Sequence, residues 1–283
     1  MNFQTLRIID ANLDRATEGL RVLEDIARFV LDDIHLSGRL KALRHSIHQA
    51  YPDISIKLIS ARNSLDDVGR QVEHQKEPGT SFSDTVIAIA RRAEQSLRVL
   101  EETSRLADTS INGSIFEESR YAMYGLEKDL ISRLSRRDKS AKLDMYAMVE
   151  NETQFSEAVE HKITAIQFNP EIQTQREYYF LAKDFRDRCS AEAILLIIGE
   201  HLGITIASDA DGVTLDANSI PMSIARGLLK IDQLIGYSAK SPEEAIRAES
   251  CGADYILCPE SIKEAVSLKV RIPVISPINE EDL

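Results

Sequence analysis

The first half of this chain contains one helical segment twice. Residues 15–25 read RATEGLRVLED and residues 92–102 read RAEQSLRVLEE, and Arg28 and Arg105 follow in the same register. Around the first copy, apolar residues recur at spacings of four and three from Ile9 onward, which predicts an amphipathic helix with a coiled-coil-like seam. Two such helices, each followed by another, predict two helical hairpins packed as a four-helix bundle with approximate twofold symmetry.

The helices expected in this front part cover residues 9–30, 36–51, 83–107 and 116–134. Pro52 ends the second one, because proline lacks the backbone N–H that a helix interior needs. A polar loop follows, and the basic stretch 135–142 is expected to be a linker.

The back half alternates short apolar runs with amphipathic stretches, which predicts parallel strands joined by helices. The expected strands cover residues 144–149, 165–168, 193–198, 212–215, 234–238, 255–258 and 273–275. These units predict a (β/α) TIM-type barrel that lacks its eighth unit, because the chain ends soon after the last expected strand. We therefore expect a multidomain chain: an all-α, four-helix-bundle-like domain over residues 1–138 and an incomplete barrel over residues 139–283. Open sheet edges need a cover, so a homodimer is expected as well.

Charge and apolar content exclude several classes of partner. The formal net charge of -12 argues against a binder of nucleic acid or anionic membranes, since a basic surface is missing. No apolar run has the length of a membrane span, and no signal peptide opens the chain. The cysteines have no paired spacing, which is typical of a reducing compartment. We expect a cytoplasmic protein that acts on small molecules.

Several motifs of the front half resemble a known family. They are DANLDR at residues 10–15, EGLRVLED at 18–25, LRH at 43–45, DDVG at 66–69, LRVLEE at 97–102 and LEK at 126–128. These motifs resemble the helical domain that occurs alone, or fused ahead of thiamine-phosphate synthase, in some bacteria. That domain is associated with an alternative hydroxymethylpyrimidine phosphate kinase. Asn63 departs from the pattern, in which an aspartate follows the arginine.

The back half resembles the barrel of thiamine-phosphate synthase. The matching stretches are ADGV at residues 210–213, LIGYS at 234–238 and GADYI at 252–256. This resemblance implies a TIM-type fold with a site at the carboxyl ends of the strands.

The positions that carry the family's chemistry differ in this chain. Residues 167–171 lack the arginine and lysine that grip the substrates, Gly199 and Glu200 replace an asparagine–aspartate pair, and Ser219 replaces a metal-binding aspartate. The loops at 258–261 and 276–279 lack the family's threonine, lysine and glycines. Because a pyrophosphate needs cations, Mg²⁺ and backbone amides around it, the resemblance implies a degenerate barrel without catalysis of its own.

Two arginines are expected to hold phosphate in the helical domain. Arg15 lies away from the main seam, beside Asn12 and Gly19, and Arg92 occupies the same place in the repeat. Two symmetry-related guanidinium groups on a shared groove suit a phosphate or polyphosphate, and Asn12 is assigned to the same site. The alternative is that each arginine pairs with an acidic neighbour and holds the bundle together.

Glu24 and Glu101 are the candidate catalytic carboxylates. Phosphoryl transfer from ATP needs Mg²⁺, which takes carboxylate and phosphate oxygens, and both glutamates stand at the edge of the seam. The alternative is a solvated acidic edge that pairs with arginines at helical spacing, namely Arg21, Arg28, Arg98 and Arg105.

Asp66 and Asp67 are the candidate Mg²⁺ ligands, and Arg62, just before them, is a candidate phosphate contact. A loop with a cation, two carboxylates and a glycine can close over a phosphate and its metal, and function concentrates in loops. The alternative is a helix N-cap followed by a turn.

Arg44 and His45 complete the candidate site, Arg44 as a phosphate contact and His45 as a catalytic histidine. The alternative for His45 is a packing or surface residue, since no second histidine gives a metal spacing. The chain has no Walker-type glycine loop, so an ATP site here would be unorthodox.

The resemblance as a whole implies ATP-dependent phosphorylation of hydroxymethylpyrimidine phosphate by the helical domain, with Mg²⁺, ATP as co-substrate and an inactive barrel. One alternative is a working thiamine-phosphate synthase, which joins the pyrimidine pyrophosphate to a thiazole phosphate. Another is a non-catalytic protein that binds a thiamine precursor. The kinase and the binding protein need the same arginines, so the sequence does not separate them.

Overall fold

The structure is a computed structural model. It describes residues 3–51, 55–63, 81–106, 111–171 and 174–278. The chain divides into two compact units, Met1–Leu134 (unit 1) and Ser135–Leu283 (unit 2).

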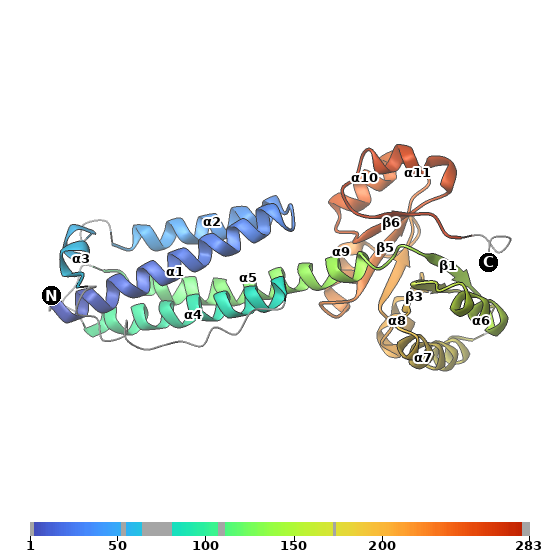
Figure 1. The fold of residues 1–283 in the computed structure, drawn as a ribbon, viewed down its shortest axis with the longest axis horizontal. Coiled ribbons are helices and arrows are strands. Elements are labelled where there is room, and N and C mark those ends of the chain that lie inside the picture. Colours follow the sequence, from blue (N-terminus) through green and yellow to red (C-terminus); the bar gives the residue numbers. More distant parts are fainter. Residues whose placement is uncertain (1–2, 52–54, 64–80, 107–110, 172–173, 279–283) are drawn as a thin grey trace. The chain divides into compact units, whose positions relative to one another are not determined.

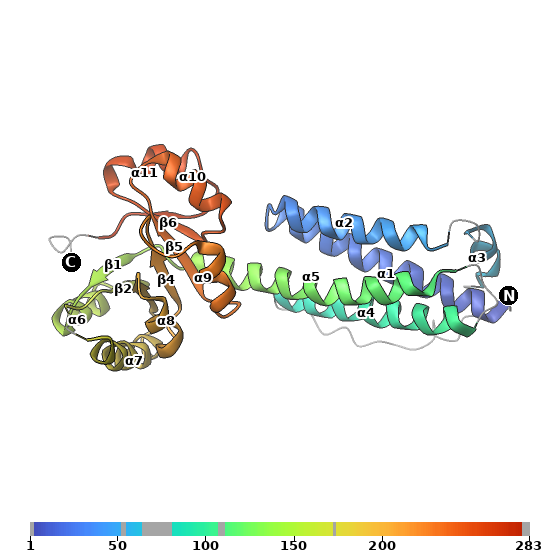
Figure 2. The ribbon, with the colours of Figure 1, turned by 180° about the vertical axis from the view of Figure 1, so that it is seen from behind.

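Unit 1 is helical, and its long helices run side by side along their lengths (Figures 1 and 2). The helices are α1 (Phe3–Phe29), α2 (Ile34–Gln49), α3 (Ser55–Ala61), α4 (Phe82–Leu106) and α5 (Gly113–Ser140). The four predicted helices are confirmed. The short α3 lies where a loop was expected, and α5 continues to Ser140 through the stretch that was expected to be a linker.

The apolar seam of the repeat forms the core of unit 1. Leu20 and Leu97, which are equivalent in the two copies, are both fully buried. Gly19 lies where α1 meets α4, and a Cβ atom there would be in ordinary van der Waals contact with the Cβ of Ala93, at 3.5 Å. Asp33 begins α2 as its N-cap, accepting hydrogen bonds from the backbone N–H groups of the first turn.

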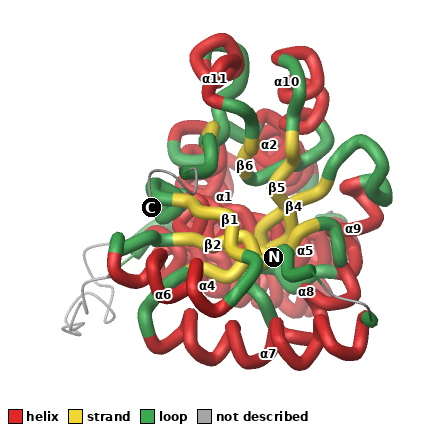
Figure 3. The backbone as a smooth tube through the Cα atoms, turned by 90° about the vertical axis from the view of Figure 1, so that its right-hand side faces the viewer, coloured by secondary structure: helices red, strands yellow, loops and turns green. Residues whose placement is uncertain are grey.

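Unit 2 is one parallel sheet whose strands pair in chain order from β1 to β7. The strands are β1 (Tyr146–Val149), β2 (Ala165–Phe168), β3 (Leu195–Gly199), β4 (Gly212–Leu215), β5 (Leu234–Ser238), β6 (Tyr255–Leu257) and β7 (Val274–Ile275). The helices between them are α6 (Glu152–Glu160), α7 (Gln175–Ala191), α8 (Leu202–Ser208), α9 (Met222–Leu228), α10 (Pro242–Ser250) and α11 (Glu260–Ser267). Figure 3 shows the sheet curving, with the helices outside it, which confirms the predicted TIM-type barrel architecture.

The free edge of β1 is not open as expected. Ile278, just after β7, forms a parallel bridge with Ala147, and its backbone N–H donates to the carbonyl of Tyr146 at 2.8 Å. The sheet therefore nearly closes on itself, and the argument for a homodimer from uncovered edges no longer holds.

Side chains fill the inside of the barrel. The hydroxyl of Tyr146 donates to Oε1 of Gln167 at 2.8 Å, and the hydroxyl of Tyr255 lies 2.9 Å from Oγ1 of Thr214. The ring of Tyr255 lies over Gly236, where any Cβ atom would be 2.1 Å from it. All four polar side chains are buried, so this interior is a core and not a channel.

A buried ionic network holds the last turns of α5 in unit 2. Arg136, only 5% exposed, donates to Asp254 at 2.9 Å, and Arg226 binds the same carboxylate. Lys139 lies 3.1 Å from Asp211, which also accepts from the N–H of Leu196. Asp211 and Asp254 stand in the family-like motifs and precede β4 and β6, so these motif residues serve the barrel's structure.

None of the described helices is both long and apolar enough to cross a membrane.

Candidate functional site

The predicted catalytic Glu24 is buried on α1 and bound to Arg44 of α2. Nε and Nη2 of Arg44 donate to the same carboxylate oxygen at 3.2 and 3.0 Å. Nη1 of Arg21 lies 3.8 Å from the other oxygen. This pair joins α1 to α2.

Glu101 repeats this geometry on α4 with Arg120 of α5. Nε and Nη2 of Arg120 donate to one oxygen at 3.2 and 3.1 Å, and Arg98 and Arg105 bind the other at 2.8 and 2.9 Å. Burial by itself raises the pKa of Glu101, but the hydrogen bonds from Arg120 and Arg98 outweigh it and lower the pKa. Glu101 is therefore a buried, ionised carboxylate at neutral pH.

The described residues do not fit a protein-bound Mg²⁺. Guanidinium groups surround the oxygens of Glu24 and Glu101, so a metal ion would have to displace them. Over the described parts of the chain, no group of three or more His, Cys, Asp or Glu side chains could hold a metal. Asp66 and Asp67, the predicted ligands, lie outside the described residues.

The predicted phosphate holders Arg15 and Arg92 are exposed, and within the described segments neither has an ion-pair or hydrogen-bond partner. Each lies one helical turn before a small residue at the α1–α4 seam, Gly19 or Ser96. Ser96 is 4% exposed, and no described residue hydrogen-bonds its hydroxyl. Two exposed arginines without described partners therefore precede the small seam residues Gly19 and Ser96, which are counterparts in the repeat.

Two other predicted contacts are engaged within the protein. Nδ2 of the buried Asn12 donates to the carbonyl of Ile8 at 2.8 Å. Arg62 donates to both oxygens of Asp10, at 2.6 and 3.0 Å, and to Asp14 at 2.9 Å, and these contacts raise its pKa. Arg62 therefore holds the end of the α3 region against α1.

A groove of about 480 Å³ lies between α1 and α2. It is lined by Thr17, Glu18, Arg21, Val22, Arg44 and His48. The predicted phosphate contact Arg44 is in it, whereas the exposed His45 is not part of the lining. His48, one helical turn after Arg44, is the histidine that faces the groove, and the i, i+4 spacing was the signal that could have identified it.

The carboxyl ends of the barrel strands are predominantly acidic. The residues that follow these strands include Glu150, Glu171, Glu200, Asp216 and Glu260, together with His201 and Lys240. Hydrogen bonds from Ser219 and from the backbone of Asn218 engage Asp216 and lower its pKa. Asn169 covers Gly199, where a Cβ atom would lie 1.8 Å from its Oδ1. These residues leave little positive charge for a pyrophosphate.

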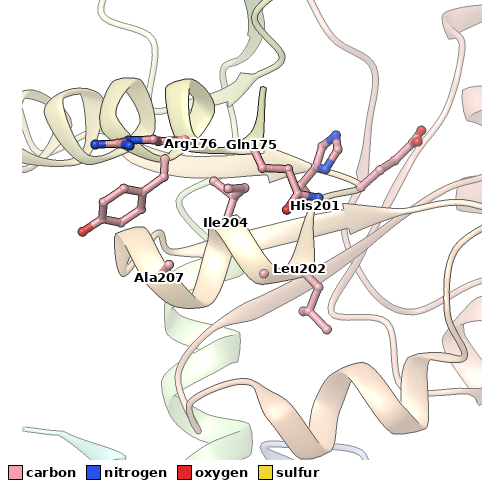
Figure 4. A pocket seen from close by; sticks show the side chains of 9 residues that line it. Gln175, Arg176, His201, Leu202, Ile204 and Ala207 are labelled. Carbon is pink, nitrogen blue, oxygen red and sulfur yellow. The ribbon is translucent and has the colours of Figure 1, made fainter. Parts of the chain in front are cut away.

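A second hollow, of about 560 Å³, lies between the start of α7 and α8 (Figure 4). Gln175, Arg176, His201 and Ile204 are among its lining residues. Figure 4 shows Arg176 pointing away from His201, so the two basic side chains do not converge on one ligand position.

Two family models match the chain, one in each unit. The ThiD2 family matches residues 7–129, and the family described as thiamine monophosphate synthase matches residues 144–263.

Curated relatives match along both units. The thiamine-phosphate synthase of Synechocystis sp. is 34% identical over 254 residues, covering 88% of this chain and 73% of that protein. The thiamine-phosphate synthase of Rhodopirellula baltica is 33% identical over 266 residues, covering 89% of this chain and 71% of that protein. A solved structure, thiamine phosphate pyrophosphorylase from Pyrococcus furiosus, matches 50% of this chain and 79% of its own at 28% identity, with a TM-score of 0.46. With relatives of this identity along most of its length, the chain belongs to the thiamine-phosphate synthase family, a family of transferases of thiamine biosynthesis.

Proposed function

We propose that unit 1 phosphorylates hydroxymethylpyrimidine phosphate with ATP, and that unit 2 does not carry the synthase reaction. The observation behind this proposal is the pair Arg15 and Arg92, which have no described partner and occupy equivalent places in the repeat, one helical turn before the small residues Gly19 and Ser96 of the α1–α4 seam. Charge-assisted hydrogen bonds from guanidinium groups are a strong way to hold phosphate. The acidic strand ends of unit 2 suit a pyrophosphate much less.

The second candidate function is that of a thiamine-phosphate synthase, and the comparisons favour it over the kinase. The relatives carry that name across both units, and a synthase family model matches unit 2. For this candidate, the pyrimidine pyrophosphate and the thiazole phosphate would bind at the carboxyl ends of β1–β7, with positive charge supplied by Lys240 and added metal.

Two assays on the full-length protein separate these functions. One supplies ATP, Mg²⁺ and hydroxymethylpyrimidine phosphate and measures ADP and the pyrimidine pyrophosphate. The other supplies the pyrimidine pyrophosphate and thiazole phosphate without ATP and measures pyrophosphate release. Turnover in the first assay alone supports the proposal, and turnover in the second alone supports the synthase.

A matched pair of variants tests the seam itself. Arg92→Ala should raise the KM for a phosphate substrate about tenfold, whereas Arg91→Ala, the exposed neighbouring arginine, should leave it unchanged. Should neither assay show turnover while ligand still raises the melting temperature, the chain is a precursor-binding protein and the kinase proposal fails.

A further inference from the structure

The two hairpins of unit 1 are equivalent in the repeat but differ in chemistry. In both, an arginine on the second helix donates through Nε and Nη2 to a single oxygen of a buried glutamate on the first: Arg44 to Glu24 and Arg120 to Glu101. With these pairs superimposed, Ile47 corresponds to Met123, and both are fully buried. The α1–α2 and α4–α5 hairpins are therefore equivalent, and one face of α4–α5 corresponds to the α1–α2 groove.

The residues at corresponding positions of the two hairpins have diverged. Three lining positions of the α1–α2 groove change in the second hairpin, Thr17 to Glu94, Glu18 to Gln95 and His48 to Tyr124, and Tyr51, the partner of His48, changes to Glu127. The first hairpin thus supplies a hydroxyl, a carboxylate, an imidazole and a phenol, whereas the second has an amide, a phenol and two carboxylates.

In the α1–α2 groove, His48 is arranged as a neutral hydrogen-bond donor. Its Nδ1 lies 2.8 Å from the hydroxyl of Tyr51. Burial lowers the pKa of His48, with a further contribution from Arg44, and burial raises the pKa of Tyr51 to about 12. The phenol therefore keeps its proton and can donate to Nδ1, which leaves the proton of the imidazole on Nε2.

The cations of this groove remain available to a ligand. Arg44 uses Nε and Nη2 for Glu24, so its Nη1 is not engaged by that carboxylate. Arg21 is 53% exposed, and its contacts with Glu24 and Asp25 are long, at 3.8 and 3.6 Å. Glu18 adds an acceptor that suits an exocyclic amino group.

The corresponding α4–α5 face carries two neighbouring carboxyl groups. Burial and the adjacent Glu127 raise the pKa of Glu94 to about 7, and Arg91 and Arg120 are the nearby cations. Arg120 also donates to the hydroxyl of Tyr124 at 3.0 Å. Two adjacent carboxyl groups disfavour a second anion there.

We infer that the α1–α2 groove binds a phosphate ester carried by an amino-substituted nitrogen heterocycle, and that the corresponding α4–α5 face does not. Arg21 and Arg44 would hold the phosphate, His48 would donate from Nε2, and Glu18 would accept from the amino group. ATP and hydroxymethylpyrimidine phosphate share this chemistry. Naming these two ligands rests on the proposed function, whereas the binding capacity of the groove does not.

Direct binding to the full-length protein tests the inference with three probes: inorganic phosphate, ATP and hydroxymethylpyrimidine phosphate. His48→Phe keeps an aromatic ring but removes the donor, and Tyr124→Phe makes the matching change at the corresponding position of α5. By titration calorimetry, His48→Phe should weaken binding of one ester about tenfold, and Tyr124→Phe should leave it unchanged. The ester affected shows which of the two the groove holds.

Equal losses of ester affinity in His48→Phe and Tyr124→Phe, or no loss of affinity in His48→Phe, would overturn the inference. Arg21→Ala, a change at an exposed side chain, keeps the test decisive if His48→Phe does not fold, and it too should weaken binding. Inorganic phosphate that binds as tightly as the esters would also contradict a site for the heterocycle. Binding with the expected variant pattern but without turnover would refute the kinase and leave the groove assignment standing.

Discussion

Glu101 shows at the scale of one residue how unit 1 depends on a buried charge. The side chain is 2% exposed and three arginines surround it. Glu101→Gln leaves these guanidinium groups without their counter-charge and should lower the free energy of unfolding by about 3 kcal/mol at pH 7. Urea unfolding measures this difference, and Glu102→Gln, at a half-exposed neighbouring side chain, should change it by about 0.5 kcal/mol or less.

The same substitution should matter less in acid. Because the folded pKa of Glu101 is lowered, its stabilisation is complete above the pH where an unfolded glutamate titrates, about 4.3, and is lost as pH falls through the folded value. The difference between wild type and Glu101→Gln should therefore shrink at pH 3. A difference that stays constant from pH 7 to pH 3 would show that the charge is not what stabilises this site.

Glu94 should produce the opposite pH dependence. Burial and the adjacent Glu127 raise its pKa from 4.5 to about 7, so the folded protein favours the neutral acid. Stability from this group is complete below about pH 4.5 and is lost as pH rises towards 7. The glutamine of Glu94→Gln stays neutral at every pH. The free energy of unfolding of this variant, relative to wild type, should therefore rise by roughly 1 kcal/mol from pH 5 to pH 8, after allowance for solvent screening. Urea unfolding at both pH values measures this gain, and Glu118→Gln, exposed on α5, should show none.

Residue contacts were predictable only where they are local. Helical spacing indicated that Arg98 and Arg105 could pair with Glu101, and both do. Arg44 and Arg120 reach their glutamates from other helices, and no spacing within one helix encodes such a contact. His48 differs, because it follows Arg44 by four residues, and this local spacing could have separated it from His45, which does not line the groove.

At the scale of elements, periodicity located most helices and strands, and β2, β4 and β5 have the predicted bounds. The end of α5 was missed because its composition is basic, as in a linker. Arg136 and Lys139 are not solvated there but engage Asp254 and Asp211 across unit 2. Long-range ion pairs of this kind leave no local pattern in a sequence.

The last turns of α5 should therefore be sensitive to substitution. Arg136→Ala removes a buried partner of Asp254 and leaves that carboxylate with Arg226 alone. This change should lower the free energy of unfolding by about 3 kcal/mol. The matched control is Arg137→Ala, at the exposed next residue, and its free energy of unfolding should lie within about 0.5 kcal/mol of the wild-type value. Urea unfolding followed by circular dichroism measures both, and equal effects would mean that the network does not stabilise this end of the helix.

At the scale of the whole molecule, each unit has its own hydrophobic core. One buried cluster draws only on residues of unit 1, and the others draw only on unit 2. A substitution in one core should then lower one thermal transition and leave the other in place. Tyr146→Phe in the barrel interior leaves Oε1 of Gln167 without its donor, at a cost of about 1–3 kcal/mol, and Glu101→Gln acts in unit 1. Scanning calorimetry should show each variant moving a different transition by roughly 3–6 °C. A single transition that both variants shift together would mean that the two cores unfold as one cooperative system.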